Sequence, residues 1–165
     1  MKRTLFVLAA VVLFISAARA QGVETITPQK ALEMSAAERT FLVDVRSVAE
    51  YVLVGHPPMA WNIPLSFWSE TEASFVPNEG FLDDLKSHFK TDDVLIFICR
   101  GGGRSRRAAQ TAATAGFIRI FNVGEGFEGA KDEKGHFVVG GWKSAGLPYT
   151  HDIDPQRAYR PSSAK

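Results

Sequence analysis

The chain has one cysteine, Cys99, within the stretch "VLIFICRGGGRSRRAAQ" at residues 94–110. The apolar run before it is typical of a buried β-strand, and three glycines, Gly101, Gly102 and Gly103, follow. Such glycines let backbone N–H groups point at a common centre, and a helix N-terminus adds further donors and a positive dipole end. The pattern predicts an anion-binding loop that favours the thiolate, the nucleophilic form of cysteine.

Four arginines follow the cysteine closely and divide by position. Arg100 and Arg104 lie in the loop or at its rim, where guanidinium groups can hold a tetrahedral anion. Arg106 and Arg107 fall in the first turn of the following helix, where a cation opposes the helix dipole, so we favour a solvated or ion-paired surface role. Ser105 is a candidate N-cap of that helix and a candidate ligand of the bound anion.

Several kinds of cysteine chemistry fit this loop poorly. A cysteine phosphatase needs five residues between the cysteine and its arginine, whereas Arg104 and Arg106 follow Cys99 after four and six residues. A thioredoxin-type enzyme needs a second cysteine, and no histidine is paired with Cys99 at sequence level, either as a base or in a metal-ligand spacing. A thiol that carries a sulfur atom as a persulfide needs only a reactive thiolate and a small oxyanion pocket. The lone thiol therefore favours sulfur transfer without cofactor or metal over a buried core role.

Turn residues divide the rest of the chain into short segments that alternate in type. The strand-like segments are residues 23–27, 40–45, 59–64, 93–99 and 117–123, and the helix-like segments are residues 28–35, 47–52, 78–89, 104–116 and 140–149. This alternation predicts one α/β domain with a mostly parallel sheet and strand 93–99 at its centre. Ligands of such sheets bind beyond the carboxyl ends of the strands, which is where Cys99 lies.

The connection at residues 65–80 is long and contains Phe67, Trp68 and Phe75. Ordered connections of this length are often lids or binding loops. The alternative is that these aromatic side chains cover a satellite core.

The two ends of the chain differ from the middle. Residues 1–20 have a positive start, an apolar run and an "ARA" ending, which predicts a signal peptide cleaved after Ala20. An uncleaved anchor is disfavoured because the apolar run is shorter than the roughly 20 residues of a membrane span. We expect a domain at residues 21–150, a tail at residues 151–165 with a mobile end, and a periplasmic location, with secretion as the alternative.

The charge of the chain limits its partners. The formal net charge is +1, and removal of the signal peptide with Lys2, Arg3 and Arg19 would make it slightly negative. This balance argues against nucleic-acid binding and against membrane binding after cleavage. Attraction for an anion must then be local to the site.

These motifs resemble those of single-domain rhodaneses. The stretch "CRGGGRS" at residues 99–105 is similar to the six-residue active-site loop of that family and the serine that follows it. Further matches in family order are "LVDVRSVAEY" at residues 42–51, "GH" at residues 55–56, "NIP" at residues 62–64 and "GGWKSAGLPY" at residues 140–149. One departure is "PPM" before "AWNIP", where the family usually has "IPG".

The resemblance implies a rhodanese-like α/β fold and a persulfide on Cys99. Thiosulfate or a related sulfane compound would be the donor, and cyanide or a thiol the acceptor. Backbone N–H groups from Arg100 to Ser105 would cradle the transferred sulfur and the oxygens of the donor. Asp44 and Arg46 would lie near the loop and help to fix it, although an ion pair that braces the strand end is an equal interpretation.

Two other functions remain open at this stage. The first is a sulfur-relay or binding module that serves a protein partner and turns over free thiosulfate poorly. The second, arsenate reduction or phosphatase action, is disfavoured by the length of the loop.

Overall fold

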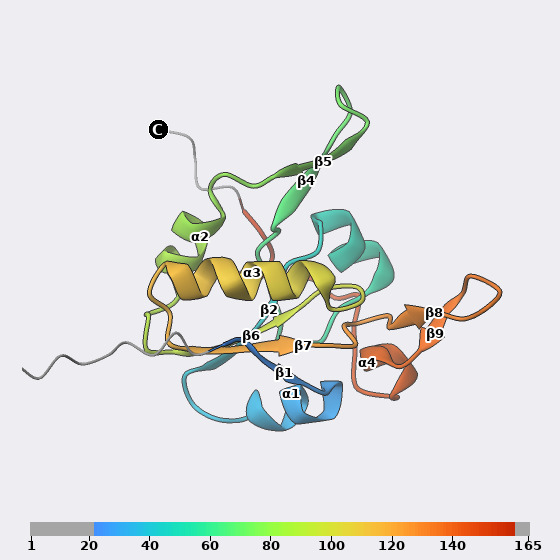
Figure 1. Ribbon diagram of the computed structural model, residues 1–165, viewed down its shortest axis with the longest axis horizontal. Helices are drawn as coiled ribbons and strands as arrows, with labels where there is room; N and C mark the ends of the chain where they lie inside the picture. Colours follow the sequence, from blue (N-terminus) through green and yellow to red (C-terminus); the bar gives the residue numbers. More distant parts are fainter. Residues whose placement is uncertain (1–21, 161–165) are drawn as a thin grey trace, which may run out of the picture.

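The computed structural model describes residues 22–160 (Figure 1). The expected signal peptide and the last residues of the tail, 161–165, lie outside the described residues. Between residues 22 and 160, no helix combines the length and the apolar character that a membrane span requires.

A five-stranded sheet forms the centre of the fold, with the order β1-β7-β6-β2-β3. Its strands are β1 (Glu24–Ile26), β2 (Thr40–Asp44), β3 (Trp61–Asn62), β6 (Val94–Ile98) and β7 (Arg119–Val123). All neighbouring strands pair in parallel, and β6 is the middle strand. The prediction of an α/β fold with a mostly parallel sheet around strand 93–99 is confirmed.

Helices cover both faces of this sheet (Figure 1). They are α1 (Pro28–Met34), the π-helix η1 (Glu50–Val54), α2 (Phe81–His88), α3 (Gly103–Thr114) and α4 (Gly141–Ser144). Helices α2 and α3 lie on one face, and α1 and α4 pack against the other. The segment predicted as a helix at residues 47–52 is thus largely a π-helical turn.

The side chains of β6 alternate between two apolar cores. Leu95, Phe97 and Cys99 join the core under α2 and α3, whereas Ile96 and Ile98 join the core beside α1 and α4. All five are at most 1% exposed. Burial of each large apolar side chain contributes about 1.5–3 kcal/mol, so β6 is held firmly in register. This alternation points the thiol of Cys99 towards α3.

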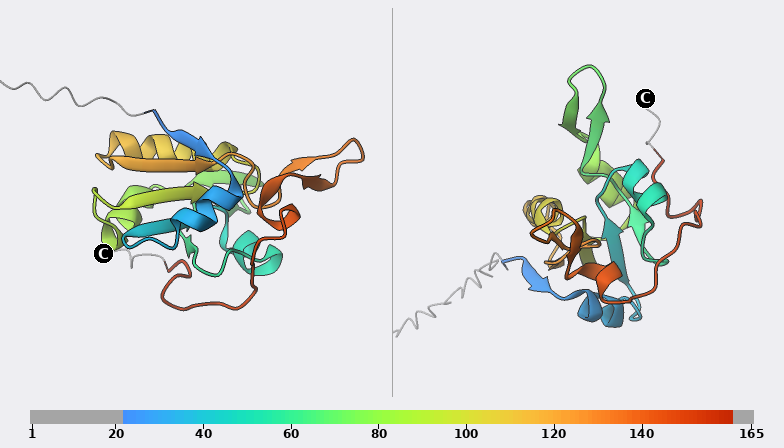
Figure 2. Two further views of the ribbon diagram at one scale, coloured as in Figure 1. Left: turned by 90° about the horizontal axis from the view of Figure 1, so that it is seen from below. Right: turned by 90° about the vertical axis from the view of Figure 1, so that its right-hand side faces the viewer.

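Two antiparallel hairpins project from the domain (Figures 1 and 2). Residues 65–80 contain the first, formed by β4 (Ser66–Ser69) and β5 (Ser74–Pro77), where the sequence indicated only a long connection. The second, formed by β8 (Ala130–Lys131) and β9 (Phe137–Val139), was not anticipated from the sequence. Both hairpins contact residues of the loop that follows β6, as described below.

The tail packs along the outer edge of the sheet as far as residue 160. The Arg157 carbonyl accepts a hydrogen bond from the N–H of Asn62 in β3, at 2.8 Å. The Tyr159 ring lies 5.5 Å from the ring of Phe67 at the base of the first hairpin. The tail therefore covers β3, the edge strand of the sheet. An uncovered edge strand could pair with another chain and promote aggregation.

Candidate active site

Cys99 follows β6 directly, at the carboxyl end of the sheet, and is 1% exposed. The hydroxyl of Ser105, itself fully buried, lies 3.3 Å from the Cys99 sulfur and 3.1 Å from the carbonyl oxygen of Gly102. Its single proton can be donated to either acceptor. Ser105 is therefore placed to donate a hydrogen bond to a thiolate or to a sulfur atom carried on it.

The interpretation of Ser105 as helix N-cap is wrong. The N-cap of α3 is Gly102, in the left-handed conformation with φ 86°, and the helix begins at Gly103. A side chain at Gly102 would also overlap the carbonyl of Gly124. Glycine is required here, because other residues are strained at this φ and no space exists for a β-carbon. Ser105 is consequently free to face the sulfur.

The first two carbonyl groups of the loop are engaged by backbone N–H groups of the segment at residues 127–129. The carbonyl of Cys99 accepts from the N–H of Phe127 at 2.8 Å, and that of Arg100 accepts from Glu128 and Gly129 at 2.9 and 3.2 Å. The first N–H groups of α3 have no acceptor within their own helix. The helix N-terminus lies beside Cys99, as the Ser105 contact shows, and there the helix dipole favours negative charge. The loop is suited to hold a thiolate and a small oxyanion.

Arg104 forms an ion pair with Glu50 of η1. Its two terminal nitrogens donate to the two Glu50 oxygens at 2.8 and 2.6 Å, and the two side chains are about one-fifth exposed. Burial of Glu50 opposes its ionisation, but hydrogen bonds from Arg104 and from Ser47 outweigh burial and lower its pKa to about 2. Both terminal nitrogens of Arg104, which could otherwise bind an anion, donate to Glu50, while the positive charge of Arg104 stays beside the loop.

Asp44 and Arg46 form a fully buried ion pair at the end of β2, with a shortest N–O distance of 2.6 Å. The same Arg46 nitrogen donates to the carbonyl of Gly55 at 2.7 Å. The Arg46 guanidinium lies 4.3 Å from the centre of the Phe127 ring, and the N–H of Phe127 holds the Cys99 carbonyl. The pair connects β2 to the segment behind the loop, a geometry in accord with a bracing role.

Arg100 is exposed and lies at the rim of the loop. Its guanidinium stacks 4.4 Å from the centre of the Phe137 ring, on the second hairpin. Arg106 and Arg107 are exposed on α3, and Arg106 contacts Thr25 weakly at 3.5 Å. The structure therefore brings Arg100 and Arg104 to the loop and leaves Arg106 and Arg107 on the surface.

Comparisons with known proteins agree with this geometry. A family model described as a rhodanese-like domain matches residues 27–133. The chain belongs to the rhodanese-like family. Residues 27–133 hold the Cys99 loop, the Asp44–Arg46 pair and Glu50, whereas Phe137 of the second hairpin lies beyond them.

Individual relatives extend the comparison. The chain is 35% identical over 111 residues to "Uncharacterized protein RP600" of Rickettsia prowazekii, covering 66% of this chain and 81% of the relative. It is 33% identical over 109 residues to "Thiosulfate sulfurtransferase 16, chloroplastic" of Arabidopsis thaliana, covering 64% and 76%. The crystal structure of Rv0390 from M. tuberculosis is 36% identical and superposes with a TM-score of 0.67, over 79% of this chain and 98% of that one. These similarities place the chain in a family that includes sulfurtransferases.

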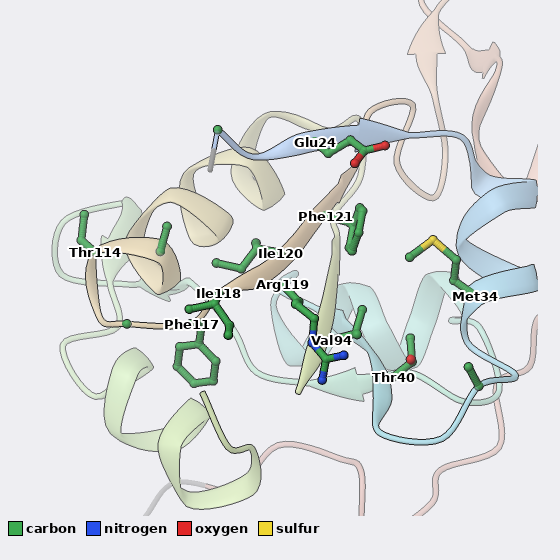
Figure 3. Close-up of a pocket in the computed structure, with 14 residues that line it drawn as sticks. Glu24, Met34, Thr40, Val94, Thr114, Phe117, Ile118, Arg119, Ile120 and Phe121 are labelled. Atoms are coloured by element: carbon green, nitrogen blue, oxygen red, sulfur yellow. The ribbon is translucent and has the colours of Figure 1, made fainter. Parts of the chain in front are cut away.

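The described part of the chain also has a hollow away from the Cys99 loop. This hollow lies at the amino ends of the strands, and Figure 3 shows Val94 and Arg119 at the first positions of β6 and β7 beside it. Its apolar lining includes Met34, Phe117 and Ile118. No predicted site residue contributes to it, because Cys99 lies at the opposite ends of the same strands.

Sequence reasoning missed two parts of the rhodanese site. Glu50 stands in the family motif at residues 42–51, yet its pairing with Arg104 depends on a contact across 54 positions of the chain. The contact of Phe137 with Arg100 depends on the hairpin at residues 130–139. The place of Glu50 in that motif was the available sequence signal for it.

Proposed function

We propose that this rhodanese is an exported sulfurtransferase that carries a sulfur atom as a persulfide on Cys99. The observation that supports the proposal most strongly is the position of the thiol. It lies beside the N-terminus of α3 and 3.3 Å from the Ser105 hydroxyl, in a loop whose Cys99 and Arg100 carbonyls are engaged by N–H groups of residues 127–129. Such surroundings stabilise a thiolate, a persulfide anion and an oxyanion alike.

In the first half-reaction, the Cys99 thiolate attacks the outer sulfur of thiosulfate. A sulfur–sulfur bond forms to Cys99, the sulfur–sulfur bond of thiosulfate breaks, and sulfite leaves with the electron pair. The loop N–H groups, the charge of Arg104 and the exposed guanidinium of Arg100 stabilise the oxygens of the donor and the leaving sulfite. No proton has to move in this step, so a general base is unnecessary.

In the second half-reaction, a nucleophile removes the outer sulfur. Cyanide attacks it through carbon, the bond to Cys99 breaks, and the electron pair returns to Cys99 as thiolate while thiocyanate leaves. The N–H groups of the loop hold the persulfide anion between the two steps. A thiol acceptor follows the same course and becomes a persulfide itself.

The test is thiocyanate formation from thiosulfate and cyanide by the mature protein and by Cys99→Ser. We expect steady turnover by the mature protein and none by the variant, with equal far-UV circular dichroism of the two. Turnover by the serine variant would contradict the assignment of the nucleophile.

A second candidate function is sulfur relay to a protein partner, with little activity on free thiosulfate. The recessed position of the Cys99 sulfur, 1% exposed, favours an acceptor that is guided to the loop. Slow thiocyanate formation together with fast transfer to a protein thiol would support this function over the first.

A further inference from the structure

Most exposed large apolar side chains lie on the elements that surround the Cys99 loop. Leu53 of η1, Trp68 and Phe75 of the first hairpin, Val139 of the second hairpin, and Tyr149 are between 45% and 76% exposed. Exposed apolar groups are common on protein surfaces when scattered, but a group of them around one site marks an interaction surface. The apolar groups here lie on elements whose residues contact Arg100 and Arg104 or lie near them.

The first hairpin has two faces, and only one is covered. On the covered face, Phe67 packs against Tyr159 of the tail. On the open face, Trp68 and Phe75 are cross-strand neighbours in a T-shaped pair at 5.4 Å, and each is more than half exposed. The Phe75 ring lies 5.9 Å from the guanidinium of Arg104, so this open face reaches the loop. Paired aromatic side chains of this kind are frequent anchors of protein interfaces.

The second hairpin contributes positive charge on the other side of the loop. The Phe137 ring has the guanidinium of Arg100 at 4.4 Å and the ammonium of Lys131 at 5.1 Å. Neither cation forms an ion pair with any residue in the described part of the chain. Asp132 and Glu133 follow at the turn of the hairpin, and Glu128 lies beside Arg100, whose carbonyl its N–H binds at 2.9 Å, yet the described residues show no ion pair of these acids with Arg100 or Lys131. Exposed cations beside the loop would attract carboxylates.

We propose that the rim formed by Trp68, Phe75, Phe137, Arg100 and Lys131 docks a protein acceptor of sulfur. The acceptor presents its thiol on an extended segment that carries apolar side chains towards Trp68 and Phe75 and carboxylates towards Arg100 and Lys131. An extended segment fits because Cys99 is only 1% exposed, so the acceptor thiol must enter on a narrow part of the partner. This inference rests on the proposed function, since it assigns the acceptor of the Cys99 persulfide.

A second copy of the chain is a poor occupant of the same rim. Its only cysteine is equally recessed, so two copies could not bring one sulfur to the other.

Binding can be measured without sulfur transfer. The probe is a short fluorescent peptide with a central serine in place of cysteine, flanked by leucine, phenylalanine and two aspartates, and it is titrated into Cys99→Ser by anisotropy. We expect Trp68→Ser and Lys131→Glu, each added to Cys99→Ser, to weaken binding about tenfold, the size of effect that interface anchors produce. Ile118→Ser is the matched control, because Ile118 is 58% exposed at the opposite ends of the strands, and it should leave binding unchanged.

Transfer is then measured with the cysteine form of the peptide and thiosulfate as donor. We expect Trp68→Ser to slow transfer to this peptide about tenfold while thiocyanate formation from cyanide stays within about twofold. Equal binding of an analogue with lysines in place of aspartates, or no effect of Trp68→Ser, would overturn the docking proposal while cyanide turnover remained. Binding that depends on Trp68, without any persulfide on Cys99, would instead overturn the proposed function and with it the acceptor role.

Discussion

Replacement of Glu50 by glutamine tests the electrostatic account of the loop. The carboxylate of Glu50 accepts two short hydrogen bonds from Arg104, beside the N-terminus of α3, and is largely buried. Glutamine keeps the size of the side chain and removes its charge. Arg104 then loses its counter-charge in a region that is poorly solvated.

The size of the effect follows from the pKa of Glu50. A pKa of about 2, against the ordinary 4.5, corresponds to roughly 3 kcal/mol of stabilisation at about 1.4 kcal/mol per tenfold change. Because one-fifth of the pair remains exposed to solvent, we expect Glu50→Gln to lower the free energy of unfolding at pH 7 by about 2 kcal/mol. A lowered pKa stabilises the fold above pH 4.5, and this contribution is lost as the pH falls towards 2.

Urea denaturation of both proteins at several pH values measures this contribution. The difference in unfolding free energy between wild type and Glu50→Gln should reach its full size above about pH 5. At about pH 3 it should be less than half as large. Glu72→Gln is the control, because Glu72 is exposed at the tip of the first hairpin, and it should change stability by less than about 0.5 kcal/mol. An unfolding free energy that is the same for wild type and Glu50→Gln at pH 7, or a difference that does not shrink at low pH, would refute the reasoning.

Three further substitutions have distinct expected outcomes. Gly102→Ala should lower the free energy of unfolding in urea by at least about 2 kcal/mol and abolish thiocyanate formation. The left-handed backbone and the Gly124 carbonyl leave no space for a methyl group at this position. Gly103→Ala is the control and should be tolerated, because a β-carbon there meets open space. Ser105→Ala should slow thiocyanate formation about tenfold with little loss of stability, and an unchanged rate would exclude a role for its hydroxyl at the sulfur. Arg46→Lys should lower the free energy of unfolding by about 3 kcal/mol, since lysine cannot pair bidentately with Asp44 in a buried site; a loss below about 1 kcal/mol would contradict the bracing role.

Much of the fold could be predicted because its signals are local. The apolar run ending at Cys99 is too short for a helix and too apolar for an edge strand, and it is the central strand. Gly116 has a φ of 96° just beyond the end of α3, as its position in the sequence indicated. The segment at residues 47–52 has helical periodicity, but nothing in it distinguishes a π-turn from an α-helix.

The parts that could not be predicted depend on contacts between distant residues. Ser105 has the chemistry of an N-cap, but Gly102 takes that position because only glycine fits against Gly124. Arg104 was expected to hold the anion together with Arg100, and its pairing with Glu50 arises from the way η1 packs beside the loop. The second hairpin lies in a polar stretch with weak strand signals, so its contact with Arg100 had no counterpart in the sequence.

The central claim is that Cys99 carries sulfur, and intact mass spectrometry of the mature protein tests it most directly. After thiosulfate is added and removed, the account predicts a gain of about 32 Da, one sulfur atom, which cyanide then removes, and no gain in Cys99→Ser. An unchanged mass after thiosulfate, in a folded protein whose thiol is free, would contradict thiosulfate as the donor. A gain that persists after cyanide, or that occurs equally in Cys99→Ser, would contradict the persulfide itself.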